Sequence, residues 1–390
     1  MAFLFAVLFC YTGCIVQNLE QQIQEDEKHI GRQKKLLLVS LCVLAVLVIA
    51  ILIKVLYPKV AIAPNGETAS FFASNLLTGQ DSQSQPVPTP FEFQELTIPY
   101  LRNREYTSKL GELKQESQTT NFTSYLTNYD SDGFKVNGLL TIPNGEEPAG
   151  GFPAVVFVHG YIPPTLYRTK ENYAAYVNYF ANRGIMVFKI DLRGHDQSEG
   201  EANGAYYSSD YVVDVLNAYS ALQADARVNK NKIGLWGHSM AGNVLFRAMA
   251  VQKNIPKIVI WAGAVYTYED FGEFGIDDNS YRPPVDDSPR RRKRQELMDI
   301  YGEFNPESWF WQQVAATNYL DGVSSAVQVH HAVNDDVVGI GYSRNLMKVL
   351  GEMAVGIPHE LFEYQTGGHN ISGTSFNQAM QRSAEFFLGE

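Results

Sequence analysis

Short apolar segments alternate with longer segments of helical character from about residue 91 to the end of the 390-residue chain. Several apolar segments are continuous, as expected for strands that are covered on both faces. Such alternation is typical of an α/β fold with a mostly parallel sheet covered by helices. We therefore predict strands at residues 138–142, 154–158, 186–190, 233–236, 258–261, 327–331 and 360–364, and helices at residues 171–182, 211–224, 242–250 and 343–354.

The predicted strand at residues 233–236 runs into the sequence Gly-His-Ser-Met-Ala-Gly and then into a predicted helix. A strand, a tight turn and a helix form the context that a nucleophile elbow requires. The turn leaves room only for small neighbours. Gly237 and Gly242 meet this demand, and Ala241 stands where a glycine is most usual. We therefore predict that Ser239 is a nucleophile, with an ordinary serine N-cap as the alternative.

A nucleophilic serine needs a base, and the base needs a carboxylate that orients it. In this kind of fold the acid and then the histidine follow the serine along the chain. The loop after the predicted strand at residues 327–331 offers Asp335 and Asp336. We favour Asp335 because it lies four residues past the end of that strand, and Val337 and Val338 then return to the core. We predict that His369 is the base, since the glycines beside it allow a close approach. The alternative for either aspartate is a solvated turn, and the alternative for His369 is a histidine on a surface loop.

Two backbone N–H groups are needed to stabilise the oxyanion that forms during acyl transfer. Met240 follows the predicted nucleophile and supplies one of them. The loop after the predicted strand at residues 154–158 reads His159-Gly160-Tyr161, and we expect the second donor to be the N–H of Tyr161. We interpret His159 as a residue that braces this loop.

Six stretches of the sequence carry a family resemblance. They read SDGFKVNGLLTIPNG, AVVFVHGYIPP, FKIDLRGHDQSEG, IGLWGHSMAG, VHHAVNDDVV and GGHNI, and they run from Ser131 to Ile371. On these residues the chain resembles the α/β-hydrolase superfamily, and within it the catalytic domain of prolyl oligopeptidase-type serine peptidases and their esterase relatives.

The resemblance implies an α/β-hydrolase fold, a triad of Ser239, Asp335 and His369, and an oxyanion hole formed by Tyr161 and Met240. The sequence contains no H-E-x-x-H motif, no paired-cysteine site and no Walker motif, so we expect no metal and no cofactor.

Two residues depart from the usual pattern of these peptidases, Ala241 in the elbow and Asp196 in place of a glycine. The β-propeller of the family is also missing, because residues 91–125 are too few to build one when a single blade takes four strands. A restriction to short peptides is therefore not implied, and carboxylester hydrolysis becomes the alternative.

An insertion rich in aromatic residues, at residues 268–320, separates two predicted strands. Its aromatic residues include Phe271, Phe274, Tyr281, Tyr301, Phe304, Trp309, Phe310 and Trp311. We predict a small helical lid that lines an apolar pocket, and the alternative is a packed helical pair without substrate contact. The basic run at residues 290–294 could contact lipid head groups. We favour a solvated helix face, because Asp286, Asp287 and Glu296 flank the run.

The apolar run LLLVSLCVLAVLVIAILI occupies residues 36–53 and just reaches the length of a membrane span. Apolar residues after Lys54 extend it, so we predict a transmembrane helix at residues 36–57. More basic residues precede the run than follow it, which places the N-terminal segment, residues 1–35, in the cytoplasm and the large domain outside. A cleaved signal peptide is the alternative.

Residues 58–94 are polar and rich in proline, which predicts a flexible linker ahead of a hydrolase domain at residues 95–390. The net charge of −11 would repel a phosphate backbone, so we expect no nucleic-acid partner. The three cysteines, Cys10, Cys14 and Cys42, all precede that domain, which excludes a disulfide, a thiolate metal site or a catalytic thiol within it.

These observations together predict a membrane-anchored serine hydrolase that acts on short peptides or small esters through an acyl-enzyme. A peptidase similar to prolyl oligopeptidase is the first interpretation, and a carboxylesterase is the second. A membrane-tethered binding protein that uses a hydrolase scaffold without catalysis is the alternative from another class.

Overall fold

The computed structural model describes residues 90–276, 289–353 and 356–389. The chain divides into two units, Met1–Val87 and Pro88–Glu390, and all the described residues belong to the second. The predicted segments at residues 1–35 and 36–57, and nearly all of the predicted linker at residues 58–94, lie outside the described residues. No helix within the described residues is long and apolar enough to cross a membrane.

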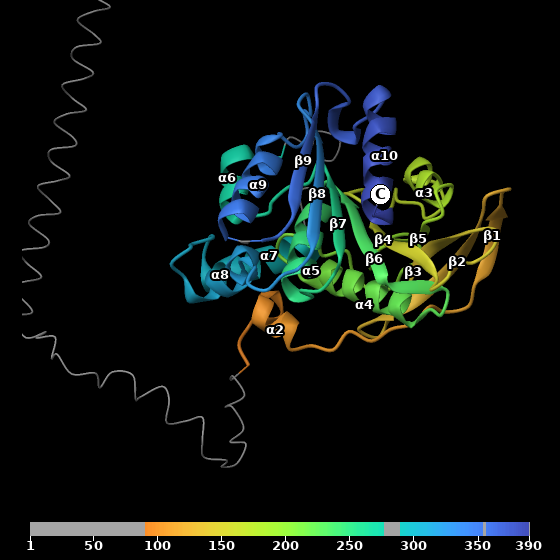
Figure 1. Ribbon diagram of the computed structural model, residues 1–390. Helices are drawn as coiled ribbons and strands as arrows, with labels where there is room; N and C mark the ends of the chain where they lie inside the picture. Colours follow the sequence, from red (N-terminus) through yellow and green to blue (C-terminus); the bar gives the residue numbers. More distant parts are fainter. Residues whose placement is uncertain (1–89, 277–288, 354–355, 390) are drawn as a thin grey trace, which may run out of the picture. The chain divides into compact units, whose positions relative to one another are not determined.

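One sheet contains every strand of the described residues, in the order β1-β2-β3-β5-β4-β6-β7-β8-β9 (Figure 1). The first three strands pair antiparallel, β3 pairs antiparallel with β5, and the strands from β5 across to β9 run parallel. The strands are β1 (Lys114–Gln118), β2 (Phe122–Ser131), β3 (Phe134–Pro143), β4 (Phe152–Val158), β5 (Met186–Ile190), β6 (Val228–His238), β7 (Lys257–Trp261), β8 (Ala326–Ala332) and β9 (His359–Tyr364).

Helices cover both faces of this sheet. The helices are α2 (Ile98–Arg102), α3 (Ala174–Ala181), α4 (Asp210–Ala224), α5 (Ala241–Val251), α6 (Tyr268–Phe274), α7 (Pro289–Tyr301), α8 (Trp309–Val314), α9 (Gly341–Met353) and α10 (Thr374–Leu388). Buried side chains of α4, α5 and α9 pack on one face, and those of α3 and α10 pack on the other. The mostly parallel sheet with helices on both faces confirms the predicted α/β-hydrolase fold.

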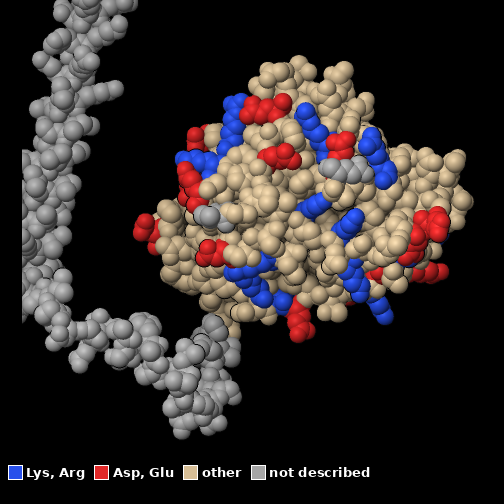
Figure 2. All heavy atoms as spheres, in the orientation of Figure 1, with Lys and Arg blue, Asp and Glu red and all other residues tan. Residues whose placement is uncertain are grey.

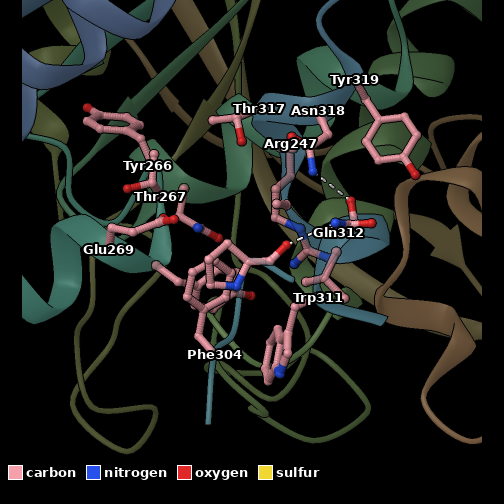
Figure 3. A pocket seen from close by; sticks show the side chains of 16 residues that line it. Arg247, Tyr266, Thr267, Glu269, Phe304, Trp311, Gln312, Thr317, Asn318 and Tyr319 are labelled. Atoms are coloured by element: carbon pink, nitrogen blue, oxygen red, sulfur yellow. Dashed lines mark hydrogen bonds between the residues drawn. The ribbon is translucent and has the colours of Figure 1, made fainter. Parts of the chain in front are cut away.

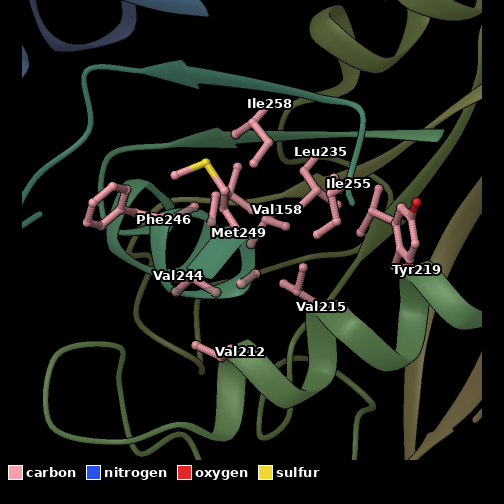
Figure 4. Packing of buried hydrophobic residues seen from close by; sticks show 14 of the residues in the cluster. Val158, Val212, Val215, Tyr219, Leu235, Val244, Phe246, Met249, Ile255 and Ile258 are labelled. Carbon is pink, nitrogen blue, oxygen red and sulfur yellow. The ribbon is translucent and has the colours of Figure 1, made fainter. Parts of the chain in front are cut away.

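Alternating residues of the central strands supply the two cores. Leu235 of β6 faces α4 and α5, where it lies with Val215 and Met249 (Figure 4). Its neighbour Trp236 faces the other way and stacks on Phe157 of β4, with ring centroids 4.1 Å apart. Because successive side chains of a strand point to opposite faces, a continuous apolar run is what a strand between two helical layers requires.

Every strand and helix predicted above is present, with ends that differ by a few residues. The prediction missed β1, β2, α2 and α10. All residues of β1 are exposed and β2 is polar over much of its length, so neither shows a buried strand's pattern. Helix α10 has an apolar stripe that includes Met380, Ala384 and Phe387, and this spacing could have identified it.

The predicted insertion contains α6, α7 and α8, between β7 and β8. Most of its aromatic side chains pack with one another. The rings of Tyr301 and Phe310 stack 3.7 Å apart, and Trp311 is fully buried beside Leu96 and Leu297. The aromatic pocket predicted from the sequence is therefore wrong for most of these residues, because their large apolar surfaces form a core of their own.

We call this core the lid cluster; its buried members are Leu96, Leu297, Phe310, Trp311 and Val314. The first residues of the domain also pack against it. The ring of Phe91 packs edge-on against Trp309, with centroids 5.1 Å apart, and the Tyr301 hydroxyl donates a hydrogen bond of 2.8 Å to the carbonyl oxygen of Glu92. The first residues of the domain and the insertion are thus held together.

Candidate active site

Ser239 lies in the turn between β6 and α5, with φ of 56°. This left-handed conformation is rare for a residue other than glycine and is the strained geometry of a nucleophile elbow. The packing explains the small residues nearby. A Cβ atom on Gly237 would lie 2.8 Å from the Cβ of Ala241, and one on Gly242 would lie 2.8 Å from the Cα of Gly263.

The loop after β8 brings Asp335 to the loop after β9. The Nδ1 atom of His369 lies 2.9 Å from Oδ2 of Asp335. Because a carboxylate oxygen only accepts, Nδ1 carries the proton and Nε2 is left with a free lone pair. The other oxygen, Oδ1, accepts two backbone hydrogen bonds of 2.9 Å, from Val337 and Val338.

The Asp335 carboxylate is fully buried and has a second histidine partner. The Nε2 atom of His331 lies 3.1 Å from Oδ2 and 2.8 Å from the carbonyl oxygen of Val338. Burial alone would raise the pKa of Asp335, but the hydrogen bonds from His331 and His369 hold that pKa well below its usual value. The carboxylate is therefore ionised throughout the neutral range. Asp336, the other candidate, lines the adjoining cavity instead.

Ser239 and His369 both border two cavities. The smaller has a volume of about 430 Å³, and its described lining includes Tyr173, Tyr176 and Asn370 but no lysine, arginine, aspartate or glutamate. The larger has a volume of about 670 Å³ and extends toward the insertion. The Ser239 hydroxyl makes no hydrogen bond within the described residues, and such contacts commonly tighten only when substrate binds.

Tyr161 and Met240 line the larger cavity beside Ser239. Met240 immediately precedes α5, so its amide belongs to the positive end of that helix. The turn before Tyr161 is tightly enclosed, because a Cβ atom on Gly160 would lie 2.9 Å from the Tyr173 hydroxyl. His159 is fully buried and braces this loop, with its ring nitrogens 2.7 Å from the Gly160 carbonyl oxygen and 3.0 Å from that of Asp191.

A chain of hydrogen bonds that the sequence did not indicate joins the loops around Ser239. The Nε2–H of His238 donates to the carbonyl oxygen of His369 at 2.8 Å. The Nδ1 atom therefore accepts, and the Tyr173 hydroxyl donates to it at 2.7 Å while accepting from the Gly160 amide at 3.0 Å. Burial lowers the pKa of His238 to about 3, which keeps this ring neutral.

Only His238 could have been found from the sequence, because it lies inside the elbow motif. Tyr173 comes from the turn ahead of α3 and carries no motif.

The larger cavity has a basic wall. Of the eight aromatic residues predicted for the insertion's pocket, Phe271 lines this cavity, and Tyr281 lies outside the described residues. The wall comes instead from Arg290, Arg291 and Arg294 of α7. These side chains are half-buried or exposed, in agreement with a solvated helix face, but the face borders the cavity.

A third cavity, of about 500 Å³, lies beside α5 and α8 and does not include Ser239 or His369 (Figure 3). Its lining includes Arg247 and two aromatic residues of the insertion, Phe304 and Trp311. Arg247 is buried and donates to the carbonyl oxygens of Leu96 and Ser208. No group of acidic, histidine or cysteine side chains within the described residues could hold a metal ion.

Comparisons with known proteins find similarity to hydrolases. Residues 152–274 match the family model described as serine aminopeptidase, S33. An uncharacterized peptidase, YtmA of Bacillus subtilis (strain 168), is 24% identical over 250 residues, which cover 63% of this chain and 85% of the relative. Thiohydrolase aneE of Aspergillus aculeatus is 30% identical over 144 residues, which cover 37% of this chain and 42% of the relative.

Solved structures are similar in fold. An acetyl xylan esterase from Paenibacillus sp. R4 has a TM-score of 0.53 at 17% identity, covering 74% of this chain and 91% of the esterase. A protein of Bacteroides ovatus described as a dipeptidyl aminopeptidase IV has a TM-score of 0.51 at 17% identity, covering 74% of this chain and 36% of that protein.

Proposed function

We propose that the chain is a serine hydrolase of the α/β-hydrolase superfamily, in which Ser239, His369 and Asp335 carry out the reaction on small esters and short peptides. One observation carries this proposal. A serine in a left-handed elbow borders the same cavity as a histidine whose Nδ1 is 2.9 Å from a buried carboxylate. This is the arrangement that acyl transfer to a serine requires.

The reaction would proceed in two halves. Asp335 holds the Nδ1 proton of His369, so Nε2 takes the hydroxyl proton as Oγ of Ser239 bonds to the substrate's carbonyl carbon. The carbonyl oxygen becomes an anion, which the N–H groups of Met240 and Tyr161 would stabilise. His369 then returns the proton to the departing alcohol or amine. Water attacks the acyl-enzyme in the same way and releases the acid and the free serine.

Esters are expected to react faster than peptides. An alkoxide leaves more readily than an unprotonated amine, so amide cleavage depends more strongly on proton transfer from His369. The comparisons support both classes of substrate, because the similar proteins include an esterase and peptidases. We therefore expect hydrolysis of short acyl esters and a narrower range of peptides.

A fluorophosphonate probe tests the nucleophile, since only an activated serine is labelled. Labelling should be lost in Ser239→Ala and kept in Ser372→Ala, a matched change to another serine that lines the larger cavity. A panel of nitrophenyl esters and of aminoacyl and dipeptidyl nitroanilides with matched acyl groups then ranks the substrates. Faster cleavage of the anilides than of every matched ester would overturn the expected preference for esters.

We also propose that residues 36–57 anchor the enzyme in a membrane with the catalytic domain outside the cytoplasm. The apolar run at residues 36–53 and the excess of basic residues before it support this topology. Protease added to intact cells should release the domain by cutting within residues 58–94. Full protection of the domain, in cells whose membranes are shown to be intact, would contradict the proposed orientation.

A further inference from the structure

Helix α7 places positive charge beside the reacting serine. Arg290, Arg291 and Arg294 line the larger cavity together with Ser239. Asp336 is the one carboxylate among the described residues of that lining. The described residues of the lining therefore carry an excess of positive charge, although the whole chain has a net charge of −11. On the face shown in Figure 2, acidic and basic side chains are interspersed instead.

Two of these arginines are held by aromatic rings. The guanidinium of Arg290 lies 5.5 Å from the ring centre of Tyr161, and that of Arg294 lies 4.7 Å from the ring centre of Tyr207. Within the described residues, neither guanidinium forms an ion pair. Stacking on a ring orients an arginine and leaves its N–H donors available to an acceptor.

The aliphatic part of the Arg290 side chain also packs closely against Gly204. A Cβ atom on Gly204 would lie 2.7 Å from Cδ of Arg290, and the φ of Gly204 is +81°. The arginine therefore packs closely on a backbone position that only glycine suits well. Since Tyr161 is the expected oxyanion-hole residue, the stacked guanidinium lies near the reacting centre.

The two cavities that meet at Ser239 differ in charge. The described residues that line the smaller one include no lysine, arginine, aspartate or glutamate. A substrate that spans the serine would thus have one part in neutral surroundings and the other beside arginines. A carboxylate suits the second part, because arginine donates paired hydrogen bonds to it.

We propose that the enzyme prefers substrates with a carboxylate on one side of the bond that is cleaved, bound by Arg290 and Arg294 in the larger cavity. This inference rests on the proposed function and names its substrate class. An acidic protein with a basic cavity would also concentrate anions at that cavity through electrostatic focusing.

Two pairs of esters test the preference on the full-length protein. The first pair places the charge in the acyl group, as the nitrophenyl monoester of adipic acid against nitrophenyl hexanoate. The second pair places it in the leaving group, as the acetate of hydroxyphenylacetic acid against the acetate of its methyl ester. The measured quantity is the ratio of kcat/KM for the charged ester to that for the uncharged one, within each pair.

In one of the two pairs, the wild-type ratio should be on the order of ten, as expected for charge-assisted hydrogen bonds that remain partly exposed to solvent. It should fall to about one in the double variant Arg290→Ala/Arg294→Ala, and with rising salt. Arg183→Ala is the matched control, because Arg183 is exposed, lies 5.0 Å from the ring centre of Tyr179 and does not line the cavity. It should keep the wild-type ratio.

Ratios at or below one in both pairs would overturn the inference, and so would a preference that survives in the double variant. Hydrolysis of the uncharged esters by the wild type, lost in Ser239→Ala, would leave the proposed function standing in either case. If no ester reacts and the fluorophosphonate fails to label Ser239, the proposed function falls, and the inference falls with it.

Discussion

Replacing Asp335 with asparagine should be far more damaging than the same change at Asp336. The side chain of Asp335 accepts from His369, from His331 and from two backbone amides, and it is fully buried. An asparagine has one oxygen to accept hydrogen bonds and an amino group that donates. If its oxygen keeps the two backbone amides, its amino group faces His369 and favours the tautomer with the proton on Nε2. That tautomer cannot take the proton of Ser239.

The expected loss is about 10⁴-fold in kcat, the size known for this change in a serine protease triad, which corresponds to roughly 5 kcal/mol of transition-state stabilisation. Asp336→Asn leaves the contact with His369 unchanged, so its kcat should stay within a few-fold of wild type. Initial rates on a nitrophenyl ester give both values, and thermal melting checks that the variants fold. Equal losses in the two variants, or a larger loss in Asp336→Asn, would refute the assignment of the acid.

Ser239→Ala should lower kcat on the same ester by on the order of 10³-fold or more without unfolding the domain, and retained turnover would exclude Ser239 as the nucleophile. Gly237→Ala places a Cβ atom 2.8 Å from that of Ala241, so urea unfolding should show a loss of roughly 1–3 kcal/mol; an unchanged midpoint would mean that the elbow can relax. Tyr173→Phe removes the donor to His238, so it should lower kcat and leave KM nearly unchanged; a change in KM alone would point to a substrate contact instead. Acid should destabilise the domain, because burial lowers the pKa of several histidines to about 3 or 4 and each takes up a proton on unfolding. Stability should therefore be full above about pH 6.5 and fall by up to about 1.4 kcal/mol per pH unit per histidine below it, and a urea midpoint that is constant from pH 7 to pH 5 would contradict this. These histidines are His159, His195, His238 and His330.

The central layer of the fold could be predicted from the sequence because its strands are buried on both faces. Runs such as AVVFV in β4 have one interpretation when helices flank them. The edge strand β1 has the sequence KQESQ, and it is a strand because β2 provides its hydrogen-bond partners. Such a strand is defined by its pairing with the next strand along the chain and not by an apolar pattern of its own, so its own residues do not indicate it.

The candidate site also contains residues that the sequence indicates and residues that only the folded structure brings together. Ser239 and its small neighbours form a local motif, whose spacing the sequence displays. The contact of Tyr173 with His238 joins residues 65 positions apart, and only the folded sheet brings them together. The insertion misled the prediction for another reason. Aromatic composition indicates burial but not the surface that is buried, and here the surface is the lid cluster.

The lid cluster also joins the beginning of the domain to the wall of the larger cavity. Phe91 and Leu96 follow directly on residues 58–90, and both pack against the insertion's aromatic residues. Helix α7 contributes Leu297 to this cluster and Arg290, Arg291 and Arg294 to the lining of the larger cavity. A substitution that loosens the first residues of the domain would therefore change the packing of α7 and, through it, the wall of a cavity that those residues do not line.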